Sequence, residues 1–482
     1  MSDDEKLKDL EPIFHPRSIA IAGASEDRSK IGTKMFLNFI AAGFKGAIYP
    51  VNPRGGSIQG VKIYPNIKAI QGPVDYVIVA IPSTNVLDLI ADCVAKGVKA
   101  VQIFSAGFSE TGNEESRRLE QEMVDRAKSA GLRIIGPNCV GISCPAIGIP
   151  VPSTGGIGKP GSIAFLSQSG GHTETLADIG RAREIRFSKL ISFGNASDLN
   201  ELDFLTYLSR DPETQIIGIY IEEGKNGRVI FERIKGIAKL KPVVVWKGGE
   251  TGVGGEIAAS HTGALAGSDM IWGAAIHQAG AVKVESLDEL ADTLLAFQNI
   301  SGVRGNRAAI ISQLGGGAGG VAVSAADVCS QHGLGIPRLG KKTRDRLSAV
   351  IRGAGTILRN PFDLGLAGRL PNILGEVLDI LDDESHVDFI MVNERIDFLR
   401  LFISLSEIHA MNDVLIDFSR RSKKPLLVVS TPASADVERV SAERRLSEAQ
   451  IAVYPSFHRA AGAIAKVLRS RPVLEVSQPQ TN

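Results

Sequence analysis

The chain has 482 residues, of which 44% are hydrophobic and 5% aromatic, and its 54 basic and 53 acidic side chains leave a formal net charge of +1. At roughly 150 residues per domain, this length predicts about three domains. The balanced charge gives no field to attract nucleic acid or an anionic membrane, and the scarcity of aromatic side chains argues against stacking platforms for single strands.

The N-terminal residues and the cysteines indicate the compartment. The first ten residues are polar, without the apolar region of a signal peptide, and no apolar run approaches the ~20 residues of a membrane helix. Cys93, Cys139, Cys144 and Cys329 lack the spacing of zinc ligands, so we expect reduced thiols and no metal site. The sequence predicts a soluble cytoplasmic protein.

Short apolar runs alternate with helical periodicity along the whole chain, which predicts an α/β fold of three doubly wound parallel-sheet domains. The first domain, residues 11–145, follows a flexible N-terminus at residues 1–10. A helix is expected where Leu119, Met123 and Ala127 fall on one face, ending at Gly131. The strands are expected at Ser18–Ala22, Ala47–Val51, Val74–Ile81, Val98–Phe104 and Leu132–Ile135.

A segment rich in Pro, Gly, Ser and Thr near residues 144–161 and a second break near residues 299–306 predict the other boundaries. The second domain is placed at residues 146–302 and the third at residues 303–472, before a flexible tail at residues 473–482. The second domain is expected to have strands near Ser162–Leu166, Lys189–Phe193, Ile216–Ile221, Pro242–Trp246 and Ala281–Val284. The third is expected to have strands near Ala308–Ser312, Val387–Val392 and Pro425–Ser430, and a helix to about Arg471.

Two turns in the second and third domains share one pattern. The segments 163–171 and 310–316 each place an apolar strand before Ser-Gln, a variable residue and two glycines. The unpaired backbone amides of a following helix carry partial positive charge, so an anion can sit at such a turn. Serine and glycine are also ordinary helix caps, which leaves both interpretations open for either turn alone.

The first predicted strand runs into a glycine-containing turn that opens a helix, with Gly23, Ser25, Lys30 and Gly32. This turn is similar to a dinucleotide-binding turn, although its spacing is not Gly-x-Gly-x-x-Gly. An NAD site expects an acidic residue after the second strand, whereas this chain has Arg54 there. A guanidinium pairs well with a phosphate on ribose, which favours NADP or coenzyme A. A solvated arginine in a turn is the plain alternative.

A single histidine, His261, stands among small residues, in a glycine-rich segment that begins at Lys247-Gly-Gly. Imidazole is abundant in its neutral form near pH 7 and can attack an electrophile. Small neighbours leave the ring accessible, and glycine lets a loop change conformation at low cost. The pattern therefore predicts a histidine that is reached by a reactant rather than buried in a core.

Taken in order, the motifs of this chain resemble the NDP-forming acyl-CoA synthetases, the superfamily of succinyl-CoA synthetase and the ADP-forming acetyl-CoA synthetases. The segment Ser260-His-Thr-Gly-Ala-Leu-Ala-Gly267 is the most specific of them. The others are Gly-Ala-Ser25 with Gly32, Asn52-Pro53, Ala106-Gly-Phe-Ser-Glu110, Gly136-Pro-Asn138, Ser167-Gln-Ser-Gly170, Gly194-Asn195 with Asp198, Tyr220-Ile-Glu222, Lys247-Gly-Gly and Asn360-Pro-Phe-Asp363.

The resemblance implies a Rossmann-like CoA-binding domain followed by two flavodoxin-like domains. It implies that acid, CoA and ATP exchange with acyl-CoA, ADP and phosphate through an acyl phosphate and a phosphohistidine at His261. Glu222 would orient the imidazole and hold its proton, and Ser167, Ser169, Gly170 and Lys247 would bind the phosphate. The residues predicted to bind coenzyme A are Gly23, Ser25, Lys30, Gly32, Arg54, Pro82, Ser83, Phe104, Ser105 and Ala106.

The chain departs from the family pattern in two places. No ATP-grasp region is found, so an α-type subunit is predicted, with ATP or ADP and Mg²⁺ bound by a separate ATP-grasp β chain in an α2β2 assembly. His172 stands where small or apolar residues are usual; it caps a helix, the favoured interpretation, or touches the acyl substrate. The alternative functions are an NADP-dependent dehydrogenase and a non-catalytic CoA-binding regulatory subunit.

Overall fold

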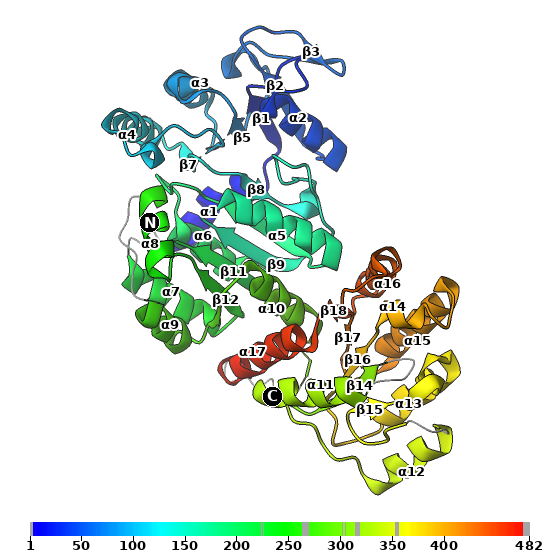
Figure 1. Ribbon diagram of the computed structural model, residues 1–482. Helices are drawn as coiled ribbons and strands as arrows, with labels where there is room; N and C mark the ends of the chain where they lie inside the picture. The colour runs from blue at the N-terminus through cyan, green and yellow to red at the C-terminus, as the bar shows by residue number, and fades with distance from the viewer. Residues whose placement is uncertain are drawn as a thin grey trace, which may run out of the picture. The chain divides into compact units, whose positions relative to one another are not determined.

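The computed structural model describes residues 3–222, 224, 226–262, 269–300, 302–303, 305–313, 319–351 and 356–475. The chain divides into two compact units. One consists of residues 1–181, 185–290 and 473–482, and the other of residues 182–184 and 291–472. The first unit contains two large sheets and the second contains one (Figure 1), so the predicted α/β class with three parallel sheets is confirmed.

The first sheet is wholly parallel and has helices on both faces (Figure 1). Its strands in spatial order are β2 (Ala47–Val51), β1 (Ser18–Ala22), β5 (Tyr76–Val79), β6 (Ala100–Ile103) and β7 (Arg133–Ile135). Its helices are α2 (Ile31–Ala42), α3 (Val86–Lys96) and α4 (Glu114–Ser129), and a short hairpin of β3 (Ser57–Ile58) and β4 (Val61–Lys62) follows β2.

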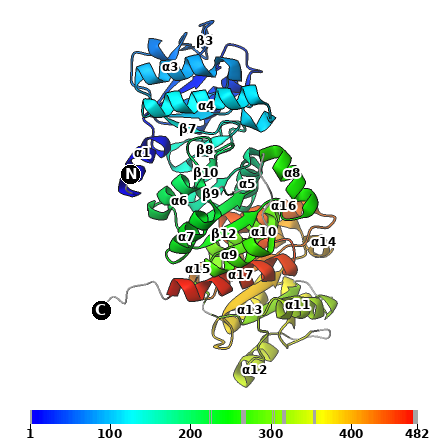
Figure 2. The same ribbon diagram turned by 90° about the vertical axis from the view of Figure 1, so that its left-hand side faces the viewer.

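Alternation along the strands separates the two cores of this sheet. Ile19 and Ile21 of β1 pack with Phe36 of α2, whereas Ala20 and Ala22 face the opposite way toward α3 and α4. Helices α3 and α4 lie side by side (Figure 2). The predicted helix face of Leu119, Met123 and Ala127 therefore packs against the second of these cores.

Residues predicted to be a flexible N-terminus instead begin helix α1 (Asp3–Phe14). Leu10, Ile13 and Phe14 are buried, and Phe14 stacks on Tyr207 of α6 (Glu201–Arg210) with ring centroids 4.3 Å apart. The polar composition of the first ten residues conceals an apolar face at helical spacing. That face attaches the chain start to the second sheet domain.

The second sheet is parallel apart from one antiparallel edge strand. Its strands in spatial order are β13 (Val282–Val284), β12 (Val243–Lys247), β11 (Ile216–Ile221), β9 (Pro160–Ser167), β10 (Phe187–Ser192) and β8 (Gly141–Ser143). The helices of this region are α5 (Gly170–Arg183), α6, α7 (Gly227–Ala238), α8 (Gly252–Thr262), α9 (Asp269–Gln278) and α10 (Leu287–Ile300). Strand β8 comes directly after the first sheet in the chain, so the connection between the two sheets is short.

The third sheet is parallel, with the strand order that places its switch point between β14 and β16. Its strands in spatial order are β15 (Phe362–Asp363), β14 (Ala308–Gln313), β16 (Phe389–Asn393), β17 (Leu426–Val429) and β18 (Ala452–Tyr454). Its helices are α11 (Gly319–Gln331), α12 (Lys341–Val350), α13 (Pro371–Asp382), α14 (Ile396–Leu399), α15 (Leu405–Arg421), α16 (Asp436–Glu448) and α17 (Phe457–Glu475). Side chains of α12, α13, α15 and α16 share one core with the sheet.

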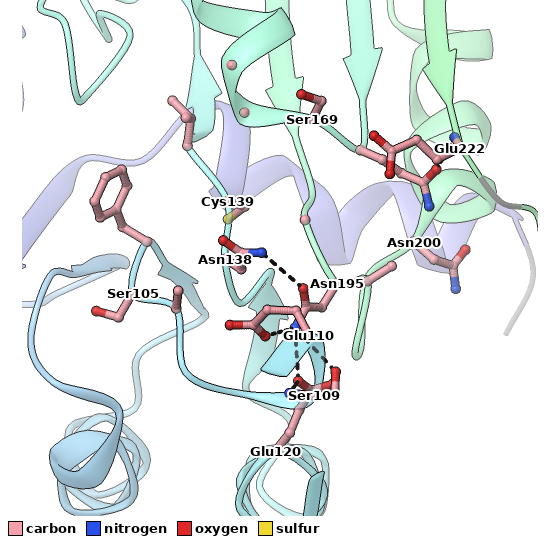
Figure 3. Close-up of a pocket in the computed structure, with 18 of the residues that line it drawn as sticks. Ser105, Ser109, Glu110, Glu120, Asn138, Cys139, Ser169, Asn195, Asn200 and Glu222 are labelled. Carbon is pink, nitrogen blue, oxygen red and sulfur yellow. Dashed lines mark hydrogen bonds between the residues drawn. The ribbon is translucent and has the colours of Figure 1, made fainter. Parts of the chain in front are cut away.

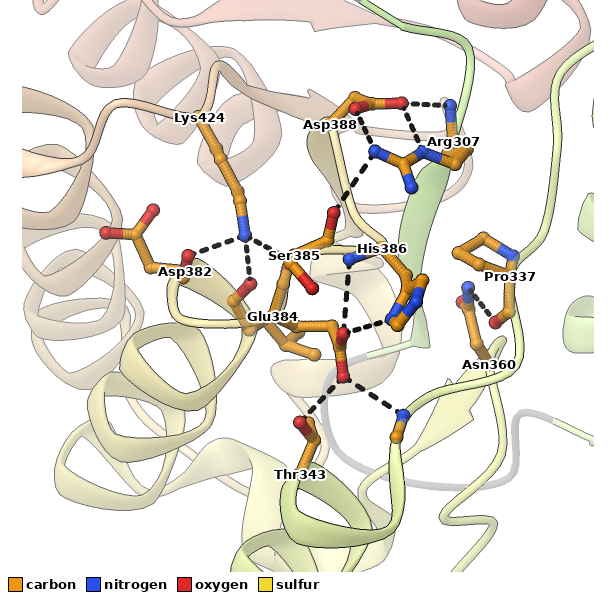
Figure 4. Close-up of polar contacts among 12 residues, drawn as sticks. Arg307, Pro337, Thr343, Asn360, Asp382, Glu384, Ser385, His386, Asp388 and Lys424 are labelled. Carbon is orange, nitrogen blue, oxygen red and sulfur yellow. Dashed lines mark hydrogen bonds and ion pairs between the residues drawn. The ribbon is translucent and has the colours of Figure 1, made fainter.

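A buried carboxylate, Glu384, fixes the loop between α13 and β16 (Figure 4). It accepts hydrogen bonds from the Gly340 amide at 3.1 Å, the Thr343 hydroxyl at 2.6 Å and the His386 amide and ring. Burial raises the pKa of Glu384, but these donors outweigh burial and lower it from 4.5 to about 2. Lys424 closes the same loop by donating to the carbonyls of Leu381, Asp382 and Glu384.

Replacing Glu384 with glutamine should weaken this domain in a pH-dependent way. At neutral pH the free energy of unfolding should fall by roughly 1–2 kcal/mol, because charge-assisted bonds become neutral ones. A carboxyl with a lowered folded-state pKa stabilises fully above its unfolded pKa, and this contribution is lost as the pH falls toward about 2. Denaturant unfolding of both proteins between about pH 7 and about pH 3 should show the gap shrinking below about pH 4.5. A gap independent of pH would contradict this account.

All four cysteines are buried free thiols. Desolvation raises the pKa of each of them to about 12, with charged neighbours adding to or offsetting it at Cys93 and Cys144. Thiols in this state are poor nucleophiles. Among the residues that the structure describes, no helix is long and apolar enough to cross a membrane, and no group of histidine, cysteine and carboxylate side chains is arranged to hold a metal ion.

Candidate functional site

A cavity of about 790 Å³ lies between the carboxyl ends of strands of the first sheet and the loops that follow strands of the second (Figure 3). This is the edge at which open parallel sheets bind ligands. The first sheet contributes the ends of β5 and β6, and the second contributes the start of α5 and the end of β11. The lining residues are Ile31, 80–82, 104–106, Ser109, Glu110, Glu120, 138–140, 168–171, 194–196, 200–202, Glu222 and Asn226.

Seven of the residues predicted from the sequence line this cavity. From the CoA-binding set these are Pro82, Phe104, Ser105 and Ala106, and from the phosphate and catalytic sets they are Ser169, Gly170 and Glu222. The hydroxyl of Ser105 donates to the carbonyl of Ile81, which joins the two strand ends. Sequence segments far apart in the chain thus meet at one site.

Of the remaining CoA-binding predictions, which are not among the cavity-lining residues, Ser83 follows β5 and the others lie near the end of β1, the start of α2 and the end of β2. Ser25 exchanges hydrogen bonds with Thr33, Lys30 is the exposed residue preceding α2, and Arg54 is exposed in the turn after β2. Ser83 begins a short 3-10 helix after β5. The exposed Lys30 and Arg54 leave cationic groups available to a phosphate.

Gly23 and Gly32 have a steric role that is independent of any ligand. Gly23 has φ +102°, and a Cβ there would lie 2.3 Å from the carbonyl oxygen of Ala80. A Cβ on Gly32 would lie 2.5 Å from the carbonyl carbon of Gly23. The turn after β1 and the first turn of α2 touch backbone to backbone, which only glycine allows.

Replacing Gly32 with alanine should therefore disturb the CoA-binding turn. We expect the free energy of unfolding to fall by about 1–3 kcal/mol from overpacking, and CoA affinity to fall with it. Gly236 in α7 is the matched control, because a Cβ there meets nothing within 4 Å and alanine favours a helix. Denaturant unfolding and calorimetric CoA titration of both variants test this; unchanged stability of the Gly32 variant would contradict the packing argument.

The start of α5 forms the part of the cavity suited to an anion. Ser169 lines the cavity and accepts from the His172 amide at 3.3 Å through its hydroxyl, so it caps the helix. Ser167 is fully buried, and its hydroxyl is used within the turn by the Ser169 carbonyl at 2.8 Å and the Ser169 amide at 3.0 Å. Gly170 and Gly171 lie on the cavity wall at the positive end of the helix.

Glu222 follows β11, and its backbone and carboxylate are both held. Its amide donates to the Gln168 side chain, its carbonyl accepts from Lys247 at 2.7 Å, and the Tyr220 hydroxyl donates to its Oε1 at 3.0 Å. Lys247, predicted to bind phosphate, is buried and also donates to the carbonyl of Gly248. The structure thus places the Lys247 ammonium against the backbone that carries Glu222.

His261 belongs to the last turn of α8, which ends at Thr262. Its side chain lies outside the described part of the structure, as do residues 263–268 of the same motif. His172 does not cap α5 with its side chain. Its ring packs on Tyr220 and Trp246, with ring centroids 4.5 Å and 4.6 Å away. Burial lowers the pKa of His172, partly offset by the charge of Glu222.

A polar cluster around Asn195 was not among the predicted site residues. The Asn195 amide donates to Glu110 at 2.6 Å and to Glu120 at 3.1 Å, and the Asn138 amide donates to it at 3.5 Å (Figure 3). Burial raises the pKa of Glu110, but the amides of Asn195, Gly107 and Phe108 hold it below its ordinary value. This cluster ties the loop after β6 to the loop after β10. Glu110, Asn138 and Asn195 stand in motifs of the family resemblance, whereas Glu120 stands in none of them, and only contact across the two domains gives the cluster a role.

The neighbouring Asp198 ties the same two domains together with charge. Its carboxylate accepts from Arg133 through Nε at 3.0 Å and through a terminal nitrogen at 3.2 Å, and from the Ile134 amide at 2.9 Å. The Asp198 side chain is 3% exposed. Burial lowers the pKa of Arg133, but the bonds to Asp198 outweigh it and raise it. The wall of the cavity formed by residues 194–196 is thereby fixed at both ends.

Comparison with known proteins agrees with this geometry. The family model for a CoA binding domain matches residues 17–145, and that for a succinyl-CoA ligase like flavodoxin domain matches residues 160–297. A protein of Pyrococcus furiosus named acetate–CoA ligase [ADP-forming] II subunit alpha is 39% identical over 75% of this chain and 77% of its own length. The acetate–CoA ligase [ADP-forming] of Methanocaldococcus jannaschii is 35% identical over 74% of this chain and 49% of its own length.

A solved structure extends the likeness to nearly the whole chain. The dinucleotide forming acetyl-coenzyme A synthetase 1 of Candidatus Korarchaeum cryptofilum, in complex with phosphate and ADP, matches with a TM-score of 0.82 and 30% identity. It covers 97% of this chain and 98% of its own. The chain belongs to the ADP-forming acyl-CoA synthetase family, as an α-subunit-like member. It spans about half the length of several curated relatives, and those named as α subunits imply a partner subunit.

Proposed function

We propose that this chain is the α-type subunit of an acid–thiol ligase that forms acyl-CoA, ADP and phosphate from a carboxylic acid, CoA and ATP. The observation that carries the proposal is the cavity in which Pro82, Phe104 and Ser105 meet the N-terminus of α5 and Glu222. Apolar and amide side chains at the strand ends suit the uncharged arm of CoA. The N-terminus of α5 suits the phosphate that reacts with the thioester of acyl-CoA.

The proposed reaction proceeds in three steps: formation of an acyl phosphate, transfer of its phosphoryl group to His261, and transfer from His261 to ADP. In the direction of ATP synthesis, a phosphate oxygen attacks the thioester carbonyl, the C–S bond breaks, and CoA leaves as the thiol with an acyl phosphate formed. The His261 imidazole then attacks the phosphorus, the bond to the acyl oxygen breaks, and the carboxylate leaves. Transfer from His261 to ADP gives ATP and restores the free histidine. Positioning and charge neutralisation are the main demands of such transfers.

Each residue set has one task in this scheme. Ser169, Gly170 and Gly171 offer hydroxyl and amide donors to the phosphoryl oxygens at the wall of the cavity. Glu222 holds the proton on one ring nitrogen of His261, which makes the other nitrogen the nucleophile. Lys247 is better suited to holding the backbone of Glu222 than to contacting phosphate, because its ammonium is used by two carbonyls.

The nucleotide half of the reaction needs a partner. We propose an ATP-grasp β chain that binds ATP or ADP and Mg²⁺, consistent with relatives that are named as α subunits. The acid is proposed to be a monocarboxylate of the kind named for the relatives, which include acetate and 4-hydroxybutyrate ligases.

Reconstitution tests the proposal. The chain is mixed with the ATP-grasp protein that co-purifies with it, and ADP release is followed with CoA and acetate, 4-hydroxybutyrate or ferulate. We expect ADP release that requires the acid, CoA and both chains together, with acyl-CoA formed in equal amount. Absence of acyl-CoA with every acid, or binding of NADP(H) in place of CoA, would contradict the proposal.

A further inference from the structure

Tyr220 stands between the proposed catalytic carboxylate and a cluster of rings. Tyr220 and Glu222 are two residues apart at the end of β11, so their side chains lie on the same side of the extended backbone. The Tyr220 hydroxyl donates to Oε1 of Glu222 at 3.0 Å. Burial is the main reason that the pKa of this hydroxyl is raised, so it remains a proton donor across the working pH range.

Three neighbours fix the position of that hydroxyl. The Tyr220 ring packs edge-on against His172, with centroids 4.5 Å apart, and tilts on Trp246 at 4.5 Å. The ring also approaches Gly248 closely, since an added Cβ there would lie 2.5 Å from the Tyr220 oxygen. Tyr220 is 6% exposed, so the ring has little room to turn away.

We infer that Tyr220 is a positioning residue, which holds the Glu222 carboxylate in the orientation that His261 requires, and that His172, Trp246 and Gly248 form its seat. This inference rests on the proposed function. It gives His172 a role by contact with Tyr220 rather than as a helix cap. A carboxylate with one oxygen tied to a phenol has a fixed plane, which reduces the reorganisation needed when the imidazole takes the phosphoryl group.

The test is a Tyr220→Phe substitution, which removes one hydroxyl and keeps the ring stack. We expect formation of the phosphohistidine from acyl-CoA and labelled inorganic phosphate to slow roughly tenfold, since the hydrogen bond involves a charged acceptor. The KM for CoA should stay unchanged, because Tyr220 does not line the cavity. Tyr207→Phe is the matched control, because the buried Tyr207 hydroxyl donates to another carboxylate, Glu11, at 3.1 Å and lies away from the site. The Tyr207→Phe variant should form phosphohistidine at the same rate as the parent.

Two further variants separate positioning from a structural effect. On a Glu222→Ala background the Tyr220→Phe change should cost nothing more, since the tyrosine acts only through that carboxylate. Gly248→Ala should slow the reaction as Tyr220→Phe does. The tyrosine hydroxyl is still present in this variant, but the added Cβ moves it out of position. If the parent takes the label and the Tyr220→Phe variant is labelled just as fast, the inference about Tyr220 is overturned while the proposed function stands. The same holds if Tyr220→Phe causes an equal loss with Glu222 present and with Glu222→Ala. A parent that takes no label would overturn the proposed function, and the inference with it.

Discussion

Replacing His261 with asparagine should reduce acyl-CoA synthesis by on the order of 10³-fold or more, because the amide cannot accept and pass on a phosphoryl group. His261 is not among the residues predicted to bind coenzyme A, so CoA binding should be unaffected. Turnover in the reconstituted system and calorimetric CoA titration measure the two effects separately. Loss of CoA affinity alongside turnover would point instead to a structural role for His261.

The control for this substitution is His277→Asn. His277 is an exposed residue in the last turn of α9, in the same domain. Its replacement should leave turnover within about twofold, as expected for a surface position away from packed features. A comparable loss in both variants would show that the effect is not specific to the imidazole of His261.

Replacing Asp198 with asparagine should lower the free energy of unfolding by about 3 kcal/mol. The change removes the nearest charged partner of the Arg133 guanidinium, and removing one member of a buried pair costs far more than the pair contributes. The side chain of Asp198 is only 3% exposed, so water cannot replace the lost contacts. Denaturant unfolding followed by circular dichroism measures the difference.

Asp178→Asn supplies the comparison for Asp198. Asp178 pairs with Arg181 at 2.5 Å, but the two side chains are 56% and 45% exposed. An exposed pair is worth about 0–1 kcal/mol, so this variant should unfold almost as the parent does. Equal effects of the two substitutions would show that burial of Asp198 does not carry the stabilisation.

Much of the fold could be predicted because long apolar runs coincide with buried strands. The bounds of β1, β2 and β11 follow their apolar runs residue for residue. The strands β8, β15 and β18 are two or three residues long and were missed, because alternation has little room to appear in so short a strand. The equally short β7 and β13 were nevertheless predicted. In α1 the helical spacing of Leu10, Ile13 and Phe14 was masked by charged residues and by Pro12.

The candidate site likewise contains residues that could be predicted from the sequence and contacts that could not. Ser169, Gly170 and Glu222 could be predicted because each follows a strand directly, at the edge where ligands bind. The contact between Asn195 and Glu110 joins residues 85 positions apart across two domains, and neither local periodicity nor turn chemistry encodes such a pairing. The seat of Tyr220 is equally non-local, since His172, Trp246 and Gly248 come from three different segments.

The measurement that tests the central claim most directly is transfer of labelled inorganic phosphate to the isolated chain in the presence of acyl-CoA. It needs no nucleotide and no partner, since the cavity and helix α8, which carries His261 in its last turn, belong to one compact unit. We predict one acid-labile, base-stable phosphoryl group per chain, located to His261 by peptide mapping and dependent on the thioester. Label on any other residue, or none with any thioester supplied, would contradict the account.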